Sequence, residues 1–206
     1  MKKLKLQRGF TLIEMLVAMS IFMVFTGILM SSYTNIIKTQ READDYRIMY
    51  SEARKVFDGI IGELREGVVE YGCAENPYSN NDGELKLIYK DGKTTSKISL
   101  EIEKKDDEEF GTVKIERKKD VDLENFALNS PEVNVKELKF YPYPYYDPYN
   151  PANVTKNSVQ FQPKVTVFAL FEKERRNGEV FQVKLQTTVS SRIYNSINTC
   201  PVPPIL

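Results

Sequence analysis

The stretch from Met15 to Ile37, MLVAMSIFMVFTGILMSSYTNII, contains 23 residues and no charged side chain. About 20 apolar residues in an α-helix are enough to span the hydrocarbon core of a bilayer. The first eight residues of the chain contain no acid and carry four basic residues, Lys2, Lys3, Lys5 and Arg8. Because basic residues stay on the cytoplasmic side, this charge pattern predicts a cytoplasmic amino terminus and an extracytoplasmic chain beyond the helix.

A secretory signal peptide and a plain membrane anchor are the two simpler interpretations of this segment. A signal peptide has a shorter apolar region and a small-residue cleavage site, whereas this apolar run is long and Ser31-Ser32-Tyr33 is a poor site. A plain anchor does not explain Glu14, which directly precedes the run. A carboxylate in or near hydrocarbon is costly unless it is paired, so Glu14 is a candidate functional residue.

The heptapeptide RGFTLIE, residues 8–14, resembles the processing motif of type IV prepilins and type II secretion pseudopilins. In that family a prepilin peptidase cuts after the glycine on the cytoplasmic side and methylates the new amino terminus. The resemblance implies cleavage between Gly9 and Phe10 and N-methylation of Phe10. Removal of nine of the 206 residues leaves a mature chain of 197. The resemblance also implies that Glu14 pairs with the amino terminus of a neighbouring subunit during assembly.

The function implied by this resemblance is that of a minor pilin or pseudopilin, which joins or initiates a type IV pilus or a type II secretion-like filament. The implied partners are other pilin or pseudopilin subunits, prepilin peptidase, assembly-platform proteins and the bacterial inner membrane, with the head outside the cytoplasm and later in the filament or at the cell surface. Residues 162–165 and 185–192 resemble the closing strands of larger minor pilins and J-type pseudopilins. Tip-type pseudopilins usually lack the acid, so Glu14 argues against the outermost tip position.

Two other function classes remain open on the sequence. One is a single-pass, membrane-anchored extracellular binding module or adhesin that does not enter a filament. The other is an anchored hydrolase that uses pairs of acidic residues. The chain has no His, which excludes His-based catalysis and His-ligated metals, and we predict that it is not an enzyme and needs no cofactor or metal. Its 29 basic and 29 acidic residues balance, which makes a nucleic-acid partner unlikely on composition.

A long helix is predicted from Phe10 to about Glu66, because no proline occurs between residues 1 and 76. Such a helix would be on the order of 85 Å long at 1.5 Å per residue. Gly67 and Gly72 are the expected stop signals. Apolar residues recur at spacings of three and four and predict one buried stripe, formed by Tyr46, Met49, Ala53, Val56, Phe57, Ile60, Leu64 and Val68. The polar residues, among them Glu63, are assigned to the opposite, exposed face.

Beyond residue 72, apolar residues alternate with a period of two, which predicts β-strands. Asp91-Gly92 and Asn177-Gly178 mark hairpin turns between them. The predicted fold is therefore α+β, a long amino-terminal α-helix whose second half packs on an antiparallel β-sheet head. The expected parts are a leader (1–9), a transmembrane or filament-core helix (10–37), a globular head (38–200, with its helix at 38–66) and a proline-rich tail (201–206).

A strongly charged segment lies between Glu101 and Glu124, where 16 of 24 residues are charged. This composition predicts a solvated hairpin with little burial on one face. Calcium prefers oxygen ligands, so an alternative is a Ca²⁺ site, but no EF-hand-like spacing supports it. The candidate ligands for that alternative are Asp106, Asp107, Glu108 and Glu109.

Residues 141–151, YPYPYYDPYNP, contain five tyrosines and four prolines, which favours extended backbone and excludes a helix. The simpler interpretation is a surface loop whose rings fold onto the domain. The alternative is a contact surface for a partner, because tyrosine is enriched at recognition surfaces. Its candidate residues are Tyr143, Tyr145, Tyr146 and Tyr149. Stacking on single-stranded DNA is disfavoured, since few basic residues are near.

Two cysteines, Cys73 and Cys200, bracket the outer domain. An extracytoplasmic head meets oxidising conditions, so the two are a candidate disulfide, with two free thiols as the alternative. Closing so long a loop would stabilise the head by about 4–5 kcal/mol on the chain-entropy account.

Overall fold

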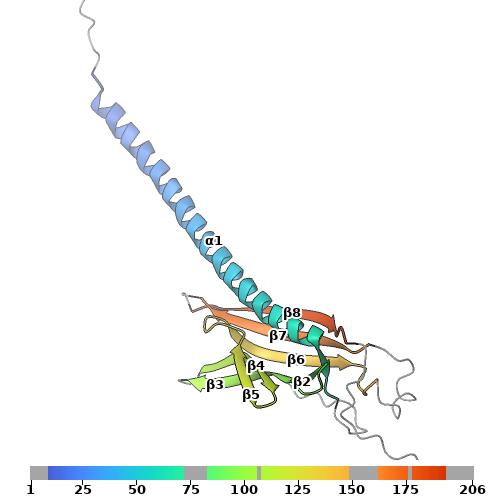
Figure 1. Cartoon of the computed structure of the whole chain (residues 1–206). Coiled ribbons are helices and arrows are strands. Elements are labelled where there is room, and N and C mark those ends of the chain that lie inside the picture. Colours follow the sequence, from blue (N-terminus) through green and yellow to red (C-terminus); the bar gives the residue numbers. More distant parts are fainter. Residues whose placement is uncertain (1–8, 72–82, 106–107, 149–161, 176–177, 194–206) are drawn as a thin grey trace, which may run out of the picture. The chain divides into compact units, whose positions relative to one another are not determined.

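The structure is a computed structural model that describes residues 9–71, 83–105, 108–148, 162–175 and 178–193. The chain divides into two compact units, Met1–Arg47 and Ile48–Leu206, and each is described by itself. Within the described residues, one helix is followed by eight strands (Figure 1), namely α1 (Leu12–Glu66), β1 (Gly67–Val69), β2 (Glu84–Tyr89), β3 (Thr95–Lys105), β4 (Glu108–Lys119), β5 (Asp122–Ala127), β6 (Asn134–Tyr143), β7 (Lys164–Glu174) and β8 (Val180–Ser190). The predicted α+β class is confirmed.

The helix α1 has 55 residues and ends where the sequence predicts, at Glu66. The reason for the end differs from the expected one. Gly67 does not adopt a left-handed conformation, and the chain passes directly into β1. A Cβ added at Gly67 would lie 2.9 Å from the Cβ of Leu87, so the glycine is needed for the close approach of β1 to β2.

The strands form two antiparallel sheets, whereas the sequence predicts one. The first sheet has five strands in the order β1-β2-β3-β4-β5, and the second has three in the order β6-β7-β8. The charged segment forms the predicted hairpin, in which β3 pairs with β4 from Thr95↔Lys118 to Lys105↔Glu108. Every residue of β5, the edge strand, is exposed. The expected turn at Asp91-Gly92 forms, with Gly92 at a φ value of 68°. Of the second turn, Gly178 has a φ value of 80°, and Asn177 lies outside the described residues.

The two sheets meet where β4 crosses β6. A Cβ at Gly111 would lie 2.0 Å from the carbonyl oxygen of Val135, so only glycine permits this crossing. Two asparagine side chains bond the strands there. Asn134 accepts a hydrogen bond of 2.7 Å from the Gly111 N–H, and Asn129 accepts one of 2.8 Å from the Val113 N–H. These bonds satisfy backbone groups at a place where no regular ladder continues.

The core of the second unit lies between the last turns of α1 and the two sheets. Figure 1 shows this part of α1 running along the sheet of β6, β7 and β8. The ring centroids of Phe57 on α1 and Phe171 on β7 are 6.1 Å apart. Most of the predicted stripe is buried, namely Met49, Ala53, Val56, Phe57, Ile60 and Leu64. The prediction of Tyr46 as a core residue is wrong, because its side chain is 45% exposed. Val68 is buried as predicted, but it lies in β1 rather than on the helix.

Glu63 differs from a second expectation, because the sequence pattern predicts it on the exposed face of the helix and it is instead 7% exposed. Its carboxylate accepts a hydrogen bond of 2.5 Å from the Arg117 guanidinium on β4 and another from the Tyr89 hydroxyl on β2. The guanidinium also lies 5.7 Å from the centre of the Tyr89 ring. A buried carboxylate is tolerated here because a cation and a hydroxyl replace its water.

Candidate processing and assembly site

The start of α1 is built by two side chains that bond each other's backbone. Glu14 Oε2 accepts hydrogen bonds of 2.9 Å from both the N–H and the hydroxyl of Thr11. The Thr11 hydroxyl oxygen in turn accepts a bond of 3.3 Å from the Glu14 N–H. This is a capping box, in which a Ser or Thr at the cap and a Glu three residues later satisfy N–H groups that have no partner within the helix.

Glu14 therefore has a partner inside its own chain, and the sequence-based expectations do not include this contact. The signal was present in the spacing of Thr11 and Glu14, a Thr-x-x-Glu pattern directly before an apolar run. The bonds hold the carboxylate at Thr11, the residue after Phe10, and a chain cut after Gly9 would carry its new amino group on Phe10.

The two residues at the predicted cleavage point are fully accessible. Phe10 is 87% exposed, and a Cβ placed on Gly9 would meet no atom within 4 Å. Gly9 also lacks a left-handed backbone conformation. Neither packing nor backbone geometry in this chain requires a glycine at position 9, so its small size is available for another purpose.

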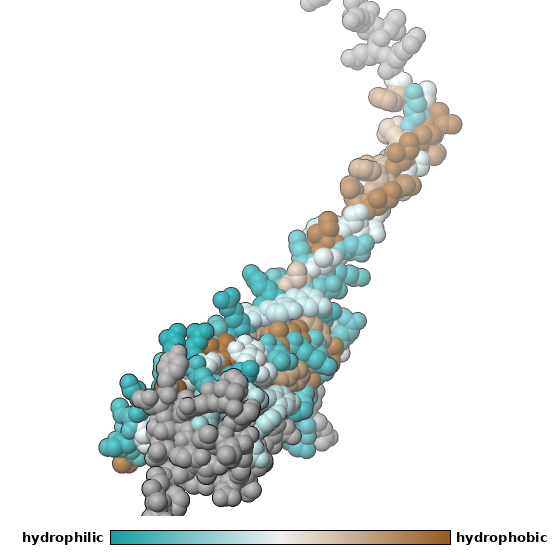
Figure 2. All heavy atoms as spheres, turned by 90° about the vertical axis from the view of Figure 1, so that its right-hand side faces the viewer, coloured by the Kyte–Doolittle hydropathy of each residue, from teal (hydrophilic) through white to brown (hydrophobic). Residues whose placement is uncertain are grey.

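The first part of α1 presents apolar side chains on all sides. By length and composition it is the one described helix that could cross a membrane, and none of its apolar window is buried. Figure 2 shows this surface as a brown band along the amino-terminal part of the helix. Single side chains such as Phe22, Met23 and Val24 are 65–71% exposed. A helix that is hydrophobic all round is stable only when lipid or other protein surrounds it.

The structure brings together part of the predicted tyrosine contact surface. Tyr143 and Tyr145 lie side by side, with ring centroids 6.3 Å apart in an edge-to-face arrangement, and are 43% and 52% exposed. Tyr146 is half-buried. Tyr149 lies outside the described residues. The tyrosine side chains at alternate positions point outward, because Pro142 and Pro144 between them are buried.

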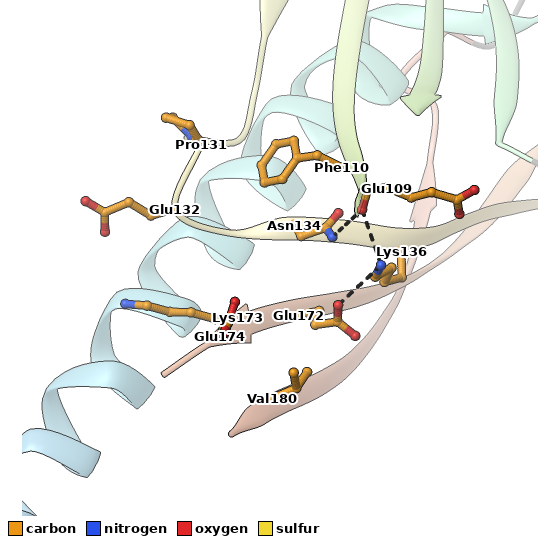
Figure 3. A pocket seen from close by; sticks show the side chains of 10 residues that line it. All are labelled: Glu109, Phe110, Pro131, Glu132, Asn134, Lys136, Glu172, Lys173, Glu174 and Val180. Carbon is orange, nitrogen blue, oxygen red and sulfur yellow. Dashed lines mark hydrogen bonds and ion pairs between the residues drawn. The ribbon is translucent and has the colours of Figure 1, made fainter. Parts of the chain in front are cut away.

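A groove lined mostly by charged side chains lies at the ends of β4, β6, β7 and β8 (Figure 3). Lys136, at an irregularity of β6, pairs with Glu172 at 3.4 Å and donates a hydrogen bond of 3.3 Å to the Glu109 carbonyl. These contacts tie β6 to its two neighbours. In the part of the chain that the structure describes, no cluster of three acidic, His or Cys side chains could hold a metal.

Two other predicted sites fall partly or wholly outside the described residues. Cys73 and Cys200 both lie outside them, so their disulfide stays a prediction. Two of the calcium candidates, Asp106 and Asp107, also lie outside them. Of the remaining calcium candidates, Glu109 forms an ion pair of 2.7 Å with Lys104.

Comparison with known proteins gives one match. Residues 4–30 match the family model of the prokaryotic N-terminal methylation motif. No curated protein and no solved structure matches the chain. The matched residues contain Gly9, Phe10, the capping box and most of the exposed apolar helix. The match supports a type IV pilin-like family for this chain, whose amino-terminal segment carries the methylation motif of a pilin- or pseudopilin-like precursor processed by prepilin peptidase.

Proposed function

We propose that the chain is a minor pilin or pseudopilin that joins or initiates a type IV pilus or a type II secretion-like filament. Prepilin peptidase cuts between Gly9 and Phe10 and methylates the amino group of Phe10. The apolar part of α1 holds the subunit in the bacterial inner membrane, with the head outside the cytoplasm, until assembly-platform proteins transfer it into the filament. The protein has a structural role and no catalytic one.

One observation carries this proposal, namely the coincidence of the matched motif with an accessible cleavage point and an uncovered apolar helix. The match covers residues 4–30, Gly9 has open space around it, and α1 begins three residues later at Leu12. A cut after Gly9 would leave the capping box of Thr11 and Glu14 intact. The mature helix would therefore start with its cap in place.

The chemistry of assembly follows from two charges at the start of the mature helix. The cut creates a cationic amine on Phe10, and in an apolar filament core this cation needs a partner. Glu14 supplies a carboxylate held by Thr11 through one oxygen, Oε2. Only Oε2 bonds Thr11, so the second oxygen, Oε1, can accept a bond from the amine of a neighbouring subunit. Paired charges are far cheaper than single ones in low dielectric.

Substitution of Gly9 tests the processing step. Gly9→Leu should leave the precursor uncut in the membrane, because the side chain blocks access to the peptide bond and disturbs nothing in the fold. Gly62→Leu is a matched control, since a Cβ at Gly62 also meets no atom within 4 Å and lies outside the motif. The readout is the ratio of precursor to mature chain on a gel. Normal maturation of Gly9→Leu would remove the support for this function.

A membrane-anchored binding module that never enters a filament is the second candidate, and the exposed tyrosines of the head favour it. This alternative requires no cleavage, so it expects the same full-length chain in the wild type and in Gly9→Leu. It also expects no chain in sheared, purified filaments. Detection of the mature chain in such filaments by immunoblot distinguishes the two functions.

A further inference from the structure

The outer face of the three-stranded sheet ends in an aromatic surface that the proposed filament function does not use. We call Tyr141, Tyr143, Tyr145 and Lys164 the tyrosine surface. The three rings are 41%, 43% and 52% exposed, respectively. The ammonium group of Lys164 lies 5.1 Å from the centre of the Tyr143 ring. Three large aromatic side chains are exposed in a row here, although the side chains on the opposite face of β6 are buried.

The backbone under these rings is held firmly. Tyr141 and Tyr143 alternate along β6 with Phe140 and Pro142, which are buried. Beyond the strand, the Tyr71 hydroxyl donates a hydrogen bond of 2.8 Å to the carbonyl of Pro144. Prolines restrict the backbone further. The backbone that carries the rings is therefore fixed before any ligand arrives, which lowers the entropic cost of binding.

An ordered row of tyrosines suits one kind of ligand particularly well. Proline-rich segments in the polyproline II conformation dock into aromatic-lined surfaces, since both partners are already extended and lose little entropy. Among the four residues only Lys164 is charged, and its ammonium group is engaged with the Tyr143 ring. The next charged side chains along the same face of β6, Lys139 and Glu137, form an ion pair with each other. An uncharged proline-rich segment therefore matches this surface better than an acidic peptide or a nucleic acid does.

The chain itself contains such a segment beyond β8, and the strand register places the end of β8 beside the surface. Tyr143 pairs with Lys164 on β7, and Lys164 pairs with Ser190 on β8. Adjacent strands are about 4.8 Å apart, so β8 ends roughly 10 Å from Tyr143. The carboxyl-terminal residues are PVPPIL, 201–206. The eight residue steps from Ile193 to Pro201 span at most about 29 Å, which is ample for this distance.

The predicted disulfide between Cys73 and Cys200 would favour the same arrangement. Tyr71, which bonds Pro144 next to the surface, precedes Cys73 by two residues. Cys200 directly precedes Pro201. A bond between the two cysteines would hold the start of the proline-rich tail near Pro144. The strand register leads to the tyrosine surface by itself, and the predicted disulfide would lead to the same place.

We infer that the tyrosine surface binds the proline-rich tail of its own chain, residues 201–206, as an extended segment. The bound tail covers the exposed rings and fixes the open end of the three-stranded sheet. Any outside partner that uses these tyrosines must first displace the tail. The inference concerns the head alone and does not depend on cleavage after Gly9 or on entry into a filament.

Photo-crosslinking in the full chain, purified in detergent micelles, tests this inference. A benzophenone amino acid replaces Val202, so the prolines and Cys200 remain. After irradiation, trypsin cleavage at Lys139 and Lys156 releases the peptide 140–156 that contains the tyrosines. We expect the main adduct on this peptide, in a band of monomer size. The matched control carries Pro201→Ser, Pro203→Ser and Pro204→Ser, which keeps any tether, and should reduce the yield at least fivefold.

Two further measurements complete the test. Tyr145→Leu should also reduce the yield at least fivefold, with an unchanged circular dichroism spectrum because the side chain is half exposed. A mixture of ¹⁵N-labelled and unlabelled chains should give only adducts of one isotope. Equal yield in the triple serine variant, a main adduct elsewhere, or mixed-isotope adducts that identify a second copy as the source would each overturn the inference.

Discussion

The carboxylate of Glu63 on α1 accepts a hydrogen bond of 2.5 Å from the guanidinium of Arg117 on β4. The two residues are 54 positions apart in the sequence. Glu63 is nearly buried, and the Tyr89 hydroxyl on β2 supplies its second partner. This contact fastens the last turn of the helix to the five-stranded sheet, while apolar side chains fasten the turns before it.

Loss of the Glu63 carboxylate should destabilise the head. Glu63→Leu leaves the Arg117 guanidinium without its carboxylate and Tyr89 without an acceptor. The free energy of unfolding should fall by about 2 kcal/mol, less than for a fully buried pair because the Arg117 side chain is 35% exposed. Urea unfolding followed by circular dichroism measures the change. Glu66→Leu, at an exposed position of the same turn, is the control, and equal effects of the two substitutions would contradict the assigned role.

Tyr89 should make stability depend on pH in the alkaline range. Burial, the hydrogen bond to Glu63 and the negative charge of Glu63 raise the pKa of Tyr89 well above its usual value near 10, although Arg117 opposes this shift. The folded state then keeps a proton that the unfolded state loses. The contribution of Tyr89 to the free energy of unfolding is therefore complete below about pH 10. Above that pH it declines by about 1.4 kcal/mol per pH unit.

The comparison with Tyr89→Phe isolates this contribution, because the substitution removes only the Tyr89 hydroxyl. The free energy of unfolding of the wild type, minus that of Tyr89→Phe, should decrease as the pH rises from 10 to 11. Parallel curves for the two proteins over this range would show that Tyr89 keeps an ordinary pKa in the folded state.

Two glycines with opposite surroundings should respond in opposite directions to the same change. Gly111→Ala places a Cβ 2.0 Å from the Val135 carbonyl oxygen, a clash with backbone that cannot be relieved by a side-chain rotation. We expect a loss of about 3 kcal/mol or more. Gly62→Ala meets no atom within 4 Å on an exposed helix turn and should gain about 0.5–1 kcal/mol. Thermal unfolding gives both values, and a tolerated Gly111→Ala would refute the close crossing of β4 and β6.

The same crossing shows where prediction from the sequence ends. The helix from 12 to 66, its apolar stripe and the hairpins are predictable because they depend on local periodicity and turn residues. The division into two sheets depends on Gly111 meeting Val135 and on the side chains of Asn129 and Asn134, which are contacts between distant segments. The burial of Glu63 was not predictable either, because its partners lie on β2 and β4.

The candidate site divides in the same way. The capping box follows from the spacing of Thr11 and Glu14 and was open to prediction, since both partners lie within one helical turn. The assembly role of Glu14 concerns a second subunit, and no pattern within one chain contains that subunit's position. It therefore stays a prediction that rests on the motif.

Glu14→Val should impair assembly and leave the head folded. Removal of a carboxylate from the edge of an apolar helix favours membrane insertion. In the filament, however, the amine of a neighbouring Phe10 would stay unpaired, at a cost of several kcal/mol. Since 1.4 kcal/mol corresponds to a tenfold change, incorporation should fall at least tenfold. The measurement is the amount of variant that co-purifies with sheared filaments.

Thr11→Val is the control that separates assembly from helix capping. It removes the hydroxyl that bonds Glu14 but keeps the carboxylate. The lost cap costs about 1 kcal/mol, so Thr11→Val should reduce incorporation far less than Glu14→Val. Equal losses in the two variants would assign Glu14 to the capping of its own helix rather than to a neighbouring amine.

The amino terminus of the protein from its native membrane provides the most direct test of the central claim. Mass spectrometry of the intact chain and of its first peptide should find 197 residues of the 206, beginning with an N-methylated Phe10. The methyl group distinguishes the action of prepilin peptidase from trimming by another protease. A chain that still begins at Met1, or one cut at a site other than the bond after Gly9, would contradict the account.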